Sequence, residues 1–344
     1  MRPAALAVVF AMVPVAAGAD GPAAPRFPGA DTSIAVNRAN GRVAVLRGDK
    51  LEVLESTGAA VSSVEIPGKG PRILEFCGGN LLYVTHEASN LPQVFVVITV
   101  DGRERLAFPN EGLSSFFPSE TSRLTMDGKG VYGFLPLDPP AREFFGLPES
   151  IPLVAGVAAT YRFAGEKLLA RGSEVFTGVV ALSPDDMLLT VKGGGVMRFR
   201  SPGGVAWKRE GSGGDWRIAD IDVTAGLVAV IDGDGRTLGL DLEKGEVRWQ
   251  SPGGTGPRVR DARLLRNGQV LLYASEPEAQ LAVLNPATGQ RSVTALSQAF
   301  EGRGLSGVLK FLLQHAESLA GVLEVPTTGG SALLVHGADG WYEV

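Results

Sequence analysis

Short apolar runs, separated by turns that contain Gly or Asp, recur along the whole chain. Seven of these runs start at comparable points: Gly41, Gly79, Gly130, Asp186, Gly226, Gly268 and Gly330. The spacing of these starts, and the several short strands expected in each unit, are typical of β-propeller blades, which repeat about every 40 residues. The spacing is longest before Asp186 and before Gly330. The pattern predicts an all-β chain of seven four-stranded blades, with six blades as the alternative.

The fifth unit shows the pattern most clearly. We expect its strands at residues 217–223, 227–232, 237–241 and 247–250. The last unit, residues 322–344, contains only three expected strands. We expect the stretch around Ala24–Phe27 to supply the missing outer strand, because such closure leaves no free sheet edge.

Two segments interrupt the regular spacing. Residues 134–152 fall between the second and third expected strands of the third unit, and their five prolines exclude a regular strand ladder. In residues 305–320, apolar side chains recur at steps of three and four, which predicts a short amphipathic helix before the last blade. Its apolar stripe is expected to pack on the propeller.

Two repeats carry a family resemblance. Leu238–Trp249 has a small residue, a strand that ends in Asp, a Lys-Gly turn and then Trp, and it resembles the repeat of pyrroloquinoline-quinone-type propellers. Leu281–Gln290 repeats the pattern without the Trp, and Leu182–Leu188 is similar to the Ser-Pro-Asp-Gly turn of TolB-like and WD-repeat propellers. The resemblance implies a divergent, non-catalytic member of this superfamily, with an aromatic side chain packed between adjacent blades.

The N-terminus has the three parts of a secretory signal. Arg2 precedes the apolar run Ala4–Val13, and Ala17-Gly18-Ala19 offers the small residues that signal peptidase requires. We predict a signal peptide at 1–19 cleaved after Ala19, an extended lead-in at 20–30, a propeller domain at 31–344 and a periplasmic or secreted location. A buried N-terminal strand or an uncleaved anchor is the alternative. The apolar run is too short to span a membrane as a helix, so no span is expected in the mature chain.

Composition removes several classes of function. The chain has 32 basic and 37 acidic residues and no basic cluster interleaved with aromatic residues, which argues against a nucleic-acid partner. Its single cysteine cannot form an internal disulfide. Quinone-dependent enzymes of similar repeat are larger, with a calcium site and often a vicinal disulfide, so no cofactor is expected.

Candidate catalytic and metal-binding residues are few. The three histidines, His86, His315 and His336, are far apart in sequence, and His86 and His336 end equivalent strands, so the ring could bring them to one face. A metal site needs more ligands than this, and no metal site is predicted. Asp232–Gly235 resembles the start of a calcium loop, but the downstream carboxylate is missing and a hairpin turn is favoured. We expect no catalytic residues.

By elimination, residues 134–152 are the best candidate for function. Phe144, Phe145 and Leu147 form an apolar group that we predict to bind a protein partner, since exposed apolar clusters mark such sites. The alternative is that they fold back onto the third blade. The favoured function is a monomeric, non-catalytic protein-interaction scaffold of the cell envelope. The alternatives are a small-ligand or glycan binding module, or a propeller enzyme.

Overall fold

The structure is a computed structural model, and it describes residues 24–344 with gaps. The gaps are 38–39, 67–71, 78–80, 89–90, 104, 111–122, 128–129, 137–152, 155–156, 164–169, 172–173, 184–185, 201–202, 212–213, 215, 252–257, 277, 316–317 and 328–329. The predicted signal peptide lies outside the described residues. So do Phe144, Phe145 and Leu147.

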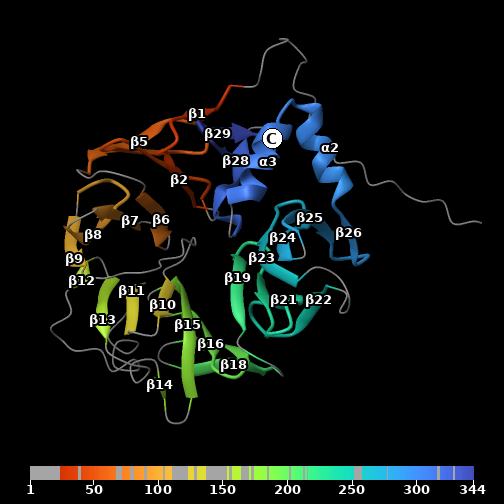
Figure 1. Cartoon of the computed structure of the whole chain (residues 1–344). Coiled ribbons are helices and arrows are strands. Elements are labelled where there is room, and N and C mark those ends of the chain that lie inside the picture. Colours follow the sequence, from red (N-terminus) through yellow and green to blue (C-terminus); the bar gives the residue numbers. More distant parts are fainter. Residues whose placement is uncertain are drawn as a thin grey trace, which may run out of the picture.

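Within the described residues the chain is all-β, with helices only near its C-terminal end (Figure 1). Four sheets each take four strands that are consecutive in the chain, every strand antiparallel to its neighbours. We name each sheet after the sequence unit that forms it. The strands are β2 (Ser33–Val36), β3 (Val43–Arg47), β4 (Lys50–Leu54) and β5 (Ala60–Glu65) in unit one; β6 (Arg72–Cys77), β7 (Leu81–Ala88), β8 (Leu91–Thr99) and β9 (Arg105–Asn110) in unit two; β19 (Arg217–Asp222), β20 (Leu227–Ile231), β21 (Thr237–Asp241) and β22 (Val247–Gln250) in unit five; and β23 (Arg258–Leu264), β24 (Val270–Glu276), β25 (Gln280–Asn285) and β26 (Gln290–Ser292) in unit six.

Units three and four share one sheet, which differs from the expectation of separate blades. Its strands are β10 (Arg123–Asp127), β11 (Gly130–Pro136), β12 (Leu153–Val154), β13 (Val157–Phe163), β14 (Ala170–Arg171), β15 (Glu174–Ser183), β16 (Asp186–Val191), β17 (Gly195–Arg200) and β18 (Gly204–Glu210). The two halves meet where Arg123 and Leu124 of β10 pair with β15. The first strand of a unit has one open edge, and here two such edges satisfy each other's backbone groups.

The first strand of each regular sheet lies toward the middle of the molecule. Figure 1 shows β2, β6, β19 and β23 inside and β5, β9, β22 and β26 outside. The inner strands of neighbouring units contact each other, β2 with β6 and β19 with β23. Because four antiparallel strands return the chain to the side where it began, β2, β6, β19 and β23 start at the same side of the molecule; β10 and β15, which pair antiparallel, do not share one starting side. We call the starting side of β2, β6, β19 and β23 the start face, and the other side the opposite face.

The hydrophobic core lies between neighbouring sheets rather than within one layer. Leu188, Val196 and Trp207 of unit four pack with Ile218 and Val230 of unit five. Other clusters join units one and two, units five and six, and unit one with the last sheet. The sheets of units one, five and six and the last sheet therefore each contribute to two clusters, as the burial of both faces of a sheet requires.

The amphipathic helix expected at 305–320 is present as α3 (Ser306–His315), followed by the short 3-10 turn η2 (Leu319–Gly321). A further helix, α2 (Thr294–Gly302), precedes it and was not expected. Phe300 of α2 and Leu312 of α3 are buried in one cluster with Tyr273 and Val335 of the sheets. The apolar stripe of α3 therefore packs on the strands, as expected.

The N-terminal strand completes the last sheet. The segment β1 (Phe27–Pro28) pairs with β29 (Gly340–Glu343), and the sheet continues through β28 (Gly330–Gly337) to β27 (Val322–Thr327). Phe27 lies opposite Trp341, so the expected outer strand is confirmed at the C-terminal end of the predicted range. The indole Nε1 of Trp341 donates to Thr32 O at 2.7 Å, and Gly29 N donates to Asp339 O at 2.8 Å.

Candidate functional site

The described side-chain contacts of His315 and His336 are with neighbouring aromatic rings and backbone carbonyls. His315 stacks on Phe311 in α3, and His336 lies against Trp341 beside the N-terminal strand. Each hydrogen-bonds to a backbone carbonyl, His315 to Phe311 O and His336 to Ala30 O. Across the described part of the chain, no group of three or more His, Cys, Asp or Glu side chains could hold a metal ion. Among the same residues, no helix is long and apolar enough to cross a membrane.

The turn at Asp232 is a hairpin turn in the structure. Its carboxylate Oδ1 accepts from Asp234 N at 2.9 Å and from Arg236 N at 2.8 Å. Gly235 has a positive φ of 77°, which lets the chain reverse between β20 and β21. The carboxylate is thus engaged in stabilising its own turn, in agreement with the favoured interpretation.

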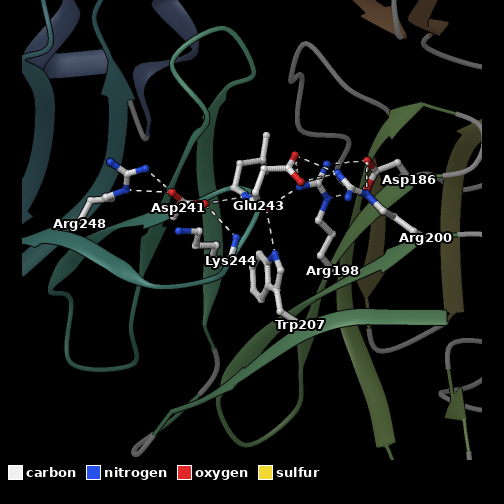
Figure 2. Close-up of polar contacts among 9 residues, drawn as sticks. Asp186, Arg198, Arg200, Trp207, Asp241, Glu243, Lys244 and Arg248 are labelled. Atoms are coloured by element: carbon white, nitrogen blue, oxygen red, sulfur yellow. Dashed lines mark hydrogen bonds and ion pairs between the residues drawn. The ribbon is translucent and has the colours of Figure 1, made fainter. Parts of the chain in front are cut away.

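Among the described residues, a cluster of polar contacts joins the sheets of units four and five (Figure 2). Trp207 of β18 donates from Nε1 to Leu242 O at 2.9 Å, in the turn between β21 and β22. Its ring lies against Gly245, where an added Cβ would come within 2.6 Å of Trp207 Cε3. Gly245 also has a positive φ of 70°, so both the turn and the close approach require glycine.

Arg198 of β17 is the centre of this joint. Its side chain is only 4% exposed, and it forms a bidentate pair with Asp186 through Nε–Oδ1 at 2.8 Å and Nη2–Oδ2 at 2.6 Å. Its Nη1 crosses to the neighbouring sheet and donates to Leu242 O at 2.5 Å and to Glu243 Oε1 at 2.9 Å. Burial disfavours the charged guanidinium, but the hydrogen bonds to Asp186 and Glu243 outweigh it and raise the pKa of Arg198.

The outer part of the joint is open to solvent. Arg200 is 41% exposed and Glu243 is 60% exposed, and Arg200 Nη2 contacts both oxygens of Glu243 at 2.9 and 3.0 Å. The hydrogen bond from Arg200, followed by that from Arg198, lowers the pKa of Glu243. Asp186 begins the second strand of unit four, and Arg200 ends its third strand. Glu243 lies in the turn between the third and fourth strands of unit five. These connections are all at the opposite face, so the ion-pair network lies there.

Asp241 and Arg248 hold the turn that carries Glu243. Asp241 accepts from the backbone N–H groups of Glu243 and Lys244 at 2.8 and 2.9 Å, and Arg248 binds its Oδ2. The hydrogen bond from Arg248, with that from Lys244 N, lowers the pKa of Asp241. The Asp of the recognised repeat therefore shapes the turn on which the neighbouring sheet docks.

A second joint repeats along the inner strands and was missed by the sequence analysis. Asp220 of β19 accepts from Leu264 N in unit six at 2.7 Å, and Asp261 of β23 accepts from Leu319 N at 2.9 Å. A β-bulge directly precedes each carboxylate, at Ala219 and at Arg260, and such bulges re-aim side chains. The sequence could have predicted this joint, because Asp220 and Asp261 are separated by one repeat length and so occupy equivalent positions in successive units.

Acid is expected to weaken the joint between units four and five through Glu243. Its folded pKa is lowered, so its contribution is complete above the ordinary glutamate value of about 4.3 and disappears as the pH falls through the lower folded value. The difference in unfolding free energy between the wild type and Glu243→Gln should be constant near neutral pH and shrink below about pH 4.3. Urea unfolding at several pH values measures it. Glu246→Gln, at an exposed position of the same turn, is the control, and a difference that stays constant into acid contradicts the assignment.

The aromatic residue of the recognised repeat lies where the resemblance implied. Trp249 packs on Gly239, where an added Cβ would lie 2.1 Å from its Cε2, and it joins the cluster between units five and six with Ala229 and Leu284. Trp207 plays the corresponding part between units four and five, although its own segment lacks the Asp of the repeat. The predicted partner residues Phe144, Phe145 and Leu147 lie outside the described residues, so they remain a prediction.

Comparison with known proteins supports the same superfamily. Residues 156–307 match the family described as outer membrane protein assembly factor BamB. No curated protein matches the chain. Three solved structures are similar to this chain. The β-propeller domain of Cps50 (Swd1) from Myceliophteria thermophila has 12% identity and a TM-score of 0.45, with coverage of 79% of this chain and 88% of that one. BamB from Moraxella catarrhalis has 16% identity and a TM-score of 0.36, with coverage of 76% of each chain, and the WD40 propeller domain of Doa1 has 12% identity and a TM-score of 0.42, with coverage of 92% of each chain.

At TM-scores below 0.5, these three similarities do not by themselves establish how the blades are arranged. The family match is stronger evidence, because it covers the units in which the repeat, the four-stranded antiparallel sheets and the docked tryptophans occur together. The match over residues 156–307 and these features support a divergent member of the pyrroloquinoline-quinone-like β-propeller superfamily.

Proposed function

We propose that this chain is an exported, seven-bladed propeller that acts as a non-catalytic protein-interaction scaffold in the cell envelope. The observation that carries the proposal is the match of residues 156–307 to a family described as an assembly factor of the outer membrane. The signal-like N-terminus agrees with export. The joints between units four, five and six tie sheet to sheet through buried groups, which suits a rigid support for a partner.

Export is tested separately from partner binding. We expect the full chain, expressed in a Gram-negative host, to be recovered from the periplasm or medium with Asp20 as its first residue. Arg2→Glu combined with Leu6→Asp should retain the chain in the cytoplasm uncleaved, because the charged and apolar parts of a signal are both required. Mature N-terminal sequencing measures the result, and a chain that keeps Met1 in the envelope fraction contradicts the cleavage prediction.

The partner site is expected at Phe144, Phe145 and Leu147. Phe144→Asp combined with Phe145→Asp should abolish recovery of a defined partner after cross-linking in intact cells and purification from the envelope fraction. Buried aromatic anchors contribute much of the binding free energy at interfaces, which is why two such changes suffice. Val223→Asp is the matched control, since Val223 is an apolar side chain 57% exposed in a different unit.

Folding must be verified before the result is interpreted. The double variant should keep the thermal unfolding midpoint of the wild type, because exposed substitutions away from the core change stability by only about 0.5 kcal/mol. Unchanged partner recovery by a folded double variant rejects this site. Failure to recover any partner with the wild type rejects the scaffold function itself.

A further inference from the structure

Arginine stands at the same place in successive inner strands. Arg217 is the first residue of β19, and Arg258, one repeat length later, is the first residue of β23. Arg72 likewise begins β6. Because β6, β19 and β23 start at the start face, these positions lie on one side of the molecule, whereas the ion pairs of Arg200 with Asp186 and Glu243 are on the opposite face. Arg217, Arg258 and the adjacent Arg260 together form what we call the arginine seam, between units five and six.

Arg258 is held in place on the neighbouring sheet. Its side-chain stem crosses Gly235, where an added Cβ would come within 2.4 Å of Arg258 Cγ. Its Nη2 then donates to Gly233 O at 2.8 Å, in the turn between β20 and β21. Among the described residues, Gly233 O is the hydrogen-bond acceptor of the Arg258 guanidinium. Arg258 is exposed to solvent. A guanidinium has five donors, so a fixed and accessible cation faces solvent here.

Arg217 enters the seam from the other sheet. Its side chain is 41% exposed, and its Nη2 lies 3.7 Å from Asp261 Oδ1. Both oxygens of Asp261 already accept from backbone N–H groups, Oδ1 from Ala262 and Oδ2 from Leu319. Asp261 therefore neutralises Arg217 only weakly, and most of the planar donor set of Arg217 remains accessible.

Arg260 adds a third exposed guanidinium next to Arg258. Its Nε donates to the hydroxyl of Ser275 at 3.1 Å. Among the described carboxylates near the seam, Asp232 is engaged in its own turn and Asp234 forms an exposed pair with Arg236 at 3.8 Å. Glu276 is the backbone register partner of Arg258. The seam thus brings three arginine side chains together in a chain whose net charge is −5.

We propose that the arginine seam binds an acidic, carboxylate-bearing segment of a partner protein. Guanidinium groups pair with carboxylates through two parallel N–H···O bonds, and two accessible arginines fixed on adjacent strands can engage neighbouring acidic side chains. A long nucleic acid fits less well, because the acidic remainder of the surface would repel it. The proposal rests on the scaffold function and specifies the chemistry of one surface, on units different from the predicted apolar partner site.

The test uses the whole mature chain and a short fluorescein-labelled oligoglutamate peptide. Fluorescence anisotropy at low and physiological salt measures binding. Arg217→Gln combined with Arg258→Gln should weaken binding at least about tenfold, since each lost hydrogen bond to a charged group affects affinity on that scale. The control, Arg47→Gln combined with Arg103→Gln, removes the same charge from exposed positions in units one and two and should leave binding within about twofold. If the double variant does not fold, the peptide affinity of Arg258→Gln alone, a change at an exposed position, is measured instead.

Equal binding by the folded seam variant and the wild type overturns the proposal, as does an equal loss in the control. Tighter binding of a labelled DNA duplex or of inorganic polyphosphate than of oligoglutamate also overturns it, because a general polyanion surface would then explain the result. Loss of peptide binding in the seam variant with unchanged binding in the control supports it. If the seam fails while the cross-linked partner is still recovered, the scaffold function stands without it; recovery of no partner rejects the scaffold function instead.

Discussion

Replacing Arg198 with methionine is expected to lower the free energy of unfolding by about 3 kcal/mol, because removing one partner of a buried ion pair leaves the other uncompensated. Arg198 is 4% exposed and Asp186 is 16% exposed. The loss should fall at the lower end of the usual range, since Arg200 Nε still reaches Asp186 at 3.2 Å. Methionine replaces the apolar stem of the side chain, so the change removes the guanidinium group with its charge and its hydrogen bonds.

Arg200→Met is the matched control for this experiment. Arg200 contacts the same two carboxylates, but it is 41% exposed, and exposed ion pairs contribute about 0.2–1 kcal/mol. Urea unfolding of both variants and of the double variant gives the coupling between the two arginines. Equal losses for Arg198→Met and Arg200→Met would show that burial of Arg198 does not determine the stability of the joint.

Removing the N-terminal strand is expected to have the other large effect. A chain that starts at Ser33 lacks β1, so β29 becomes a free edge, and Trp341 Nε1, in a residue only 5% exposed, loses Thr32 O. Leaving such a buried donor unpaired costs about 1–3 kcal/mol, to which the lost strand pairing and the Arg26–Glu343 ion pair add. We expect a loss of at least about 3 kcal/mol and self-association through the exposed edge.

A chain that starts at Ala24 is the control, because it keeps every described contact of β1. Chemical unfolding measures the loss, and size-exclusion chromatography at several concentrations detects association. A chain that starts at Ser33 yet is as stable and as monomeric as the control would show that the pairing of Phe27 with Trp341 does not secure the last sheet. Tyr342 offers a local probe, since a hydrogen bond to Asp339, in the turn before β29, raises its pKa to about 12. The truncation also removes the hydrogen bond from Gly29 N to Asp339 O, so the turn should loosen and the pKa of Tyr342 should return toward the ordinary value of about 10.

The strands of unit five show how much local pattern determines. The expected ranges 217–223, 227–232, 237–241 and 247–250 differ from the observed strands by no more than one residue at either end. Alternating burial and turn residues act over a few neighbouring positions, so they can be recognised without any knowledge of the fold. The same reason explains why the helix α3 was predicted, whereas the strand β1 was predicted from the missing fourth strand of the last unit.

The contacts and strand pairings between units were predicted less well from the sequence. The pairing of β10 with β15 depends on which open edge comes closest in space, and α2 follows β26 without a helix-capping side chain to mark its start. The contacts of Arg198 with Leu242 and Glu243 link positions that are about one repeat length apart in the chain. No short motif encodes such a pair, because it exists only once two sheets are placed side by side.

By itself, then, the sequence determined the class of the fold, the turns and strands of its clearest units, and the superfamily to which the repeat belongs, because each of these depends on residues close together in the chain. The tertiary structure alone decided which charged residues become buried joints, as Arg198 and Asp220 do, and which remain accessible, as Arg258 does. In the sequence, an arginine in a strand shows the same local pattern whether it becomes buried or stays accessible. Its surroundings, supplied by a neighbouring sheet one repeat away, set its burial, its partners and its chemistry.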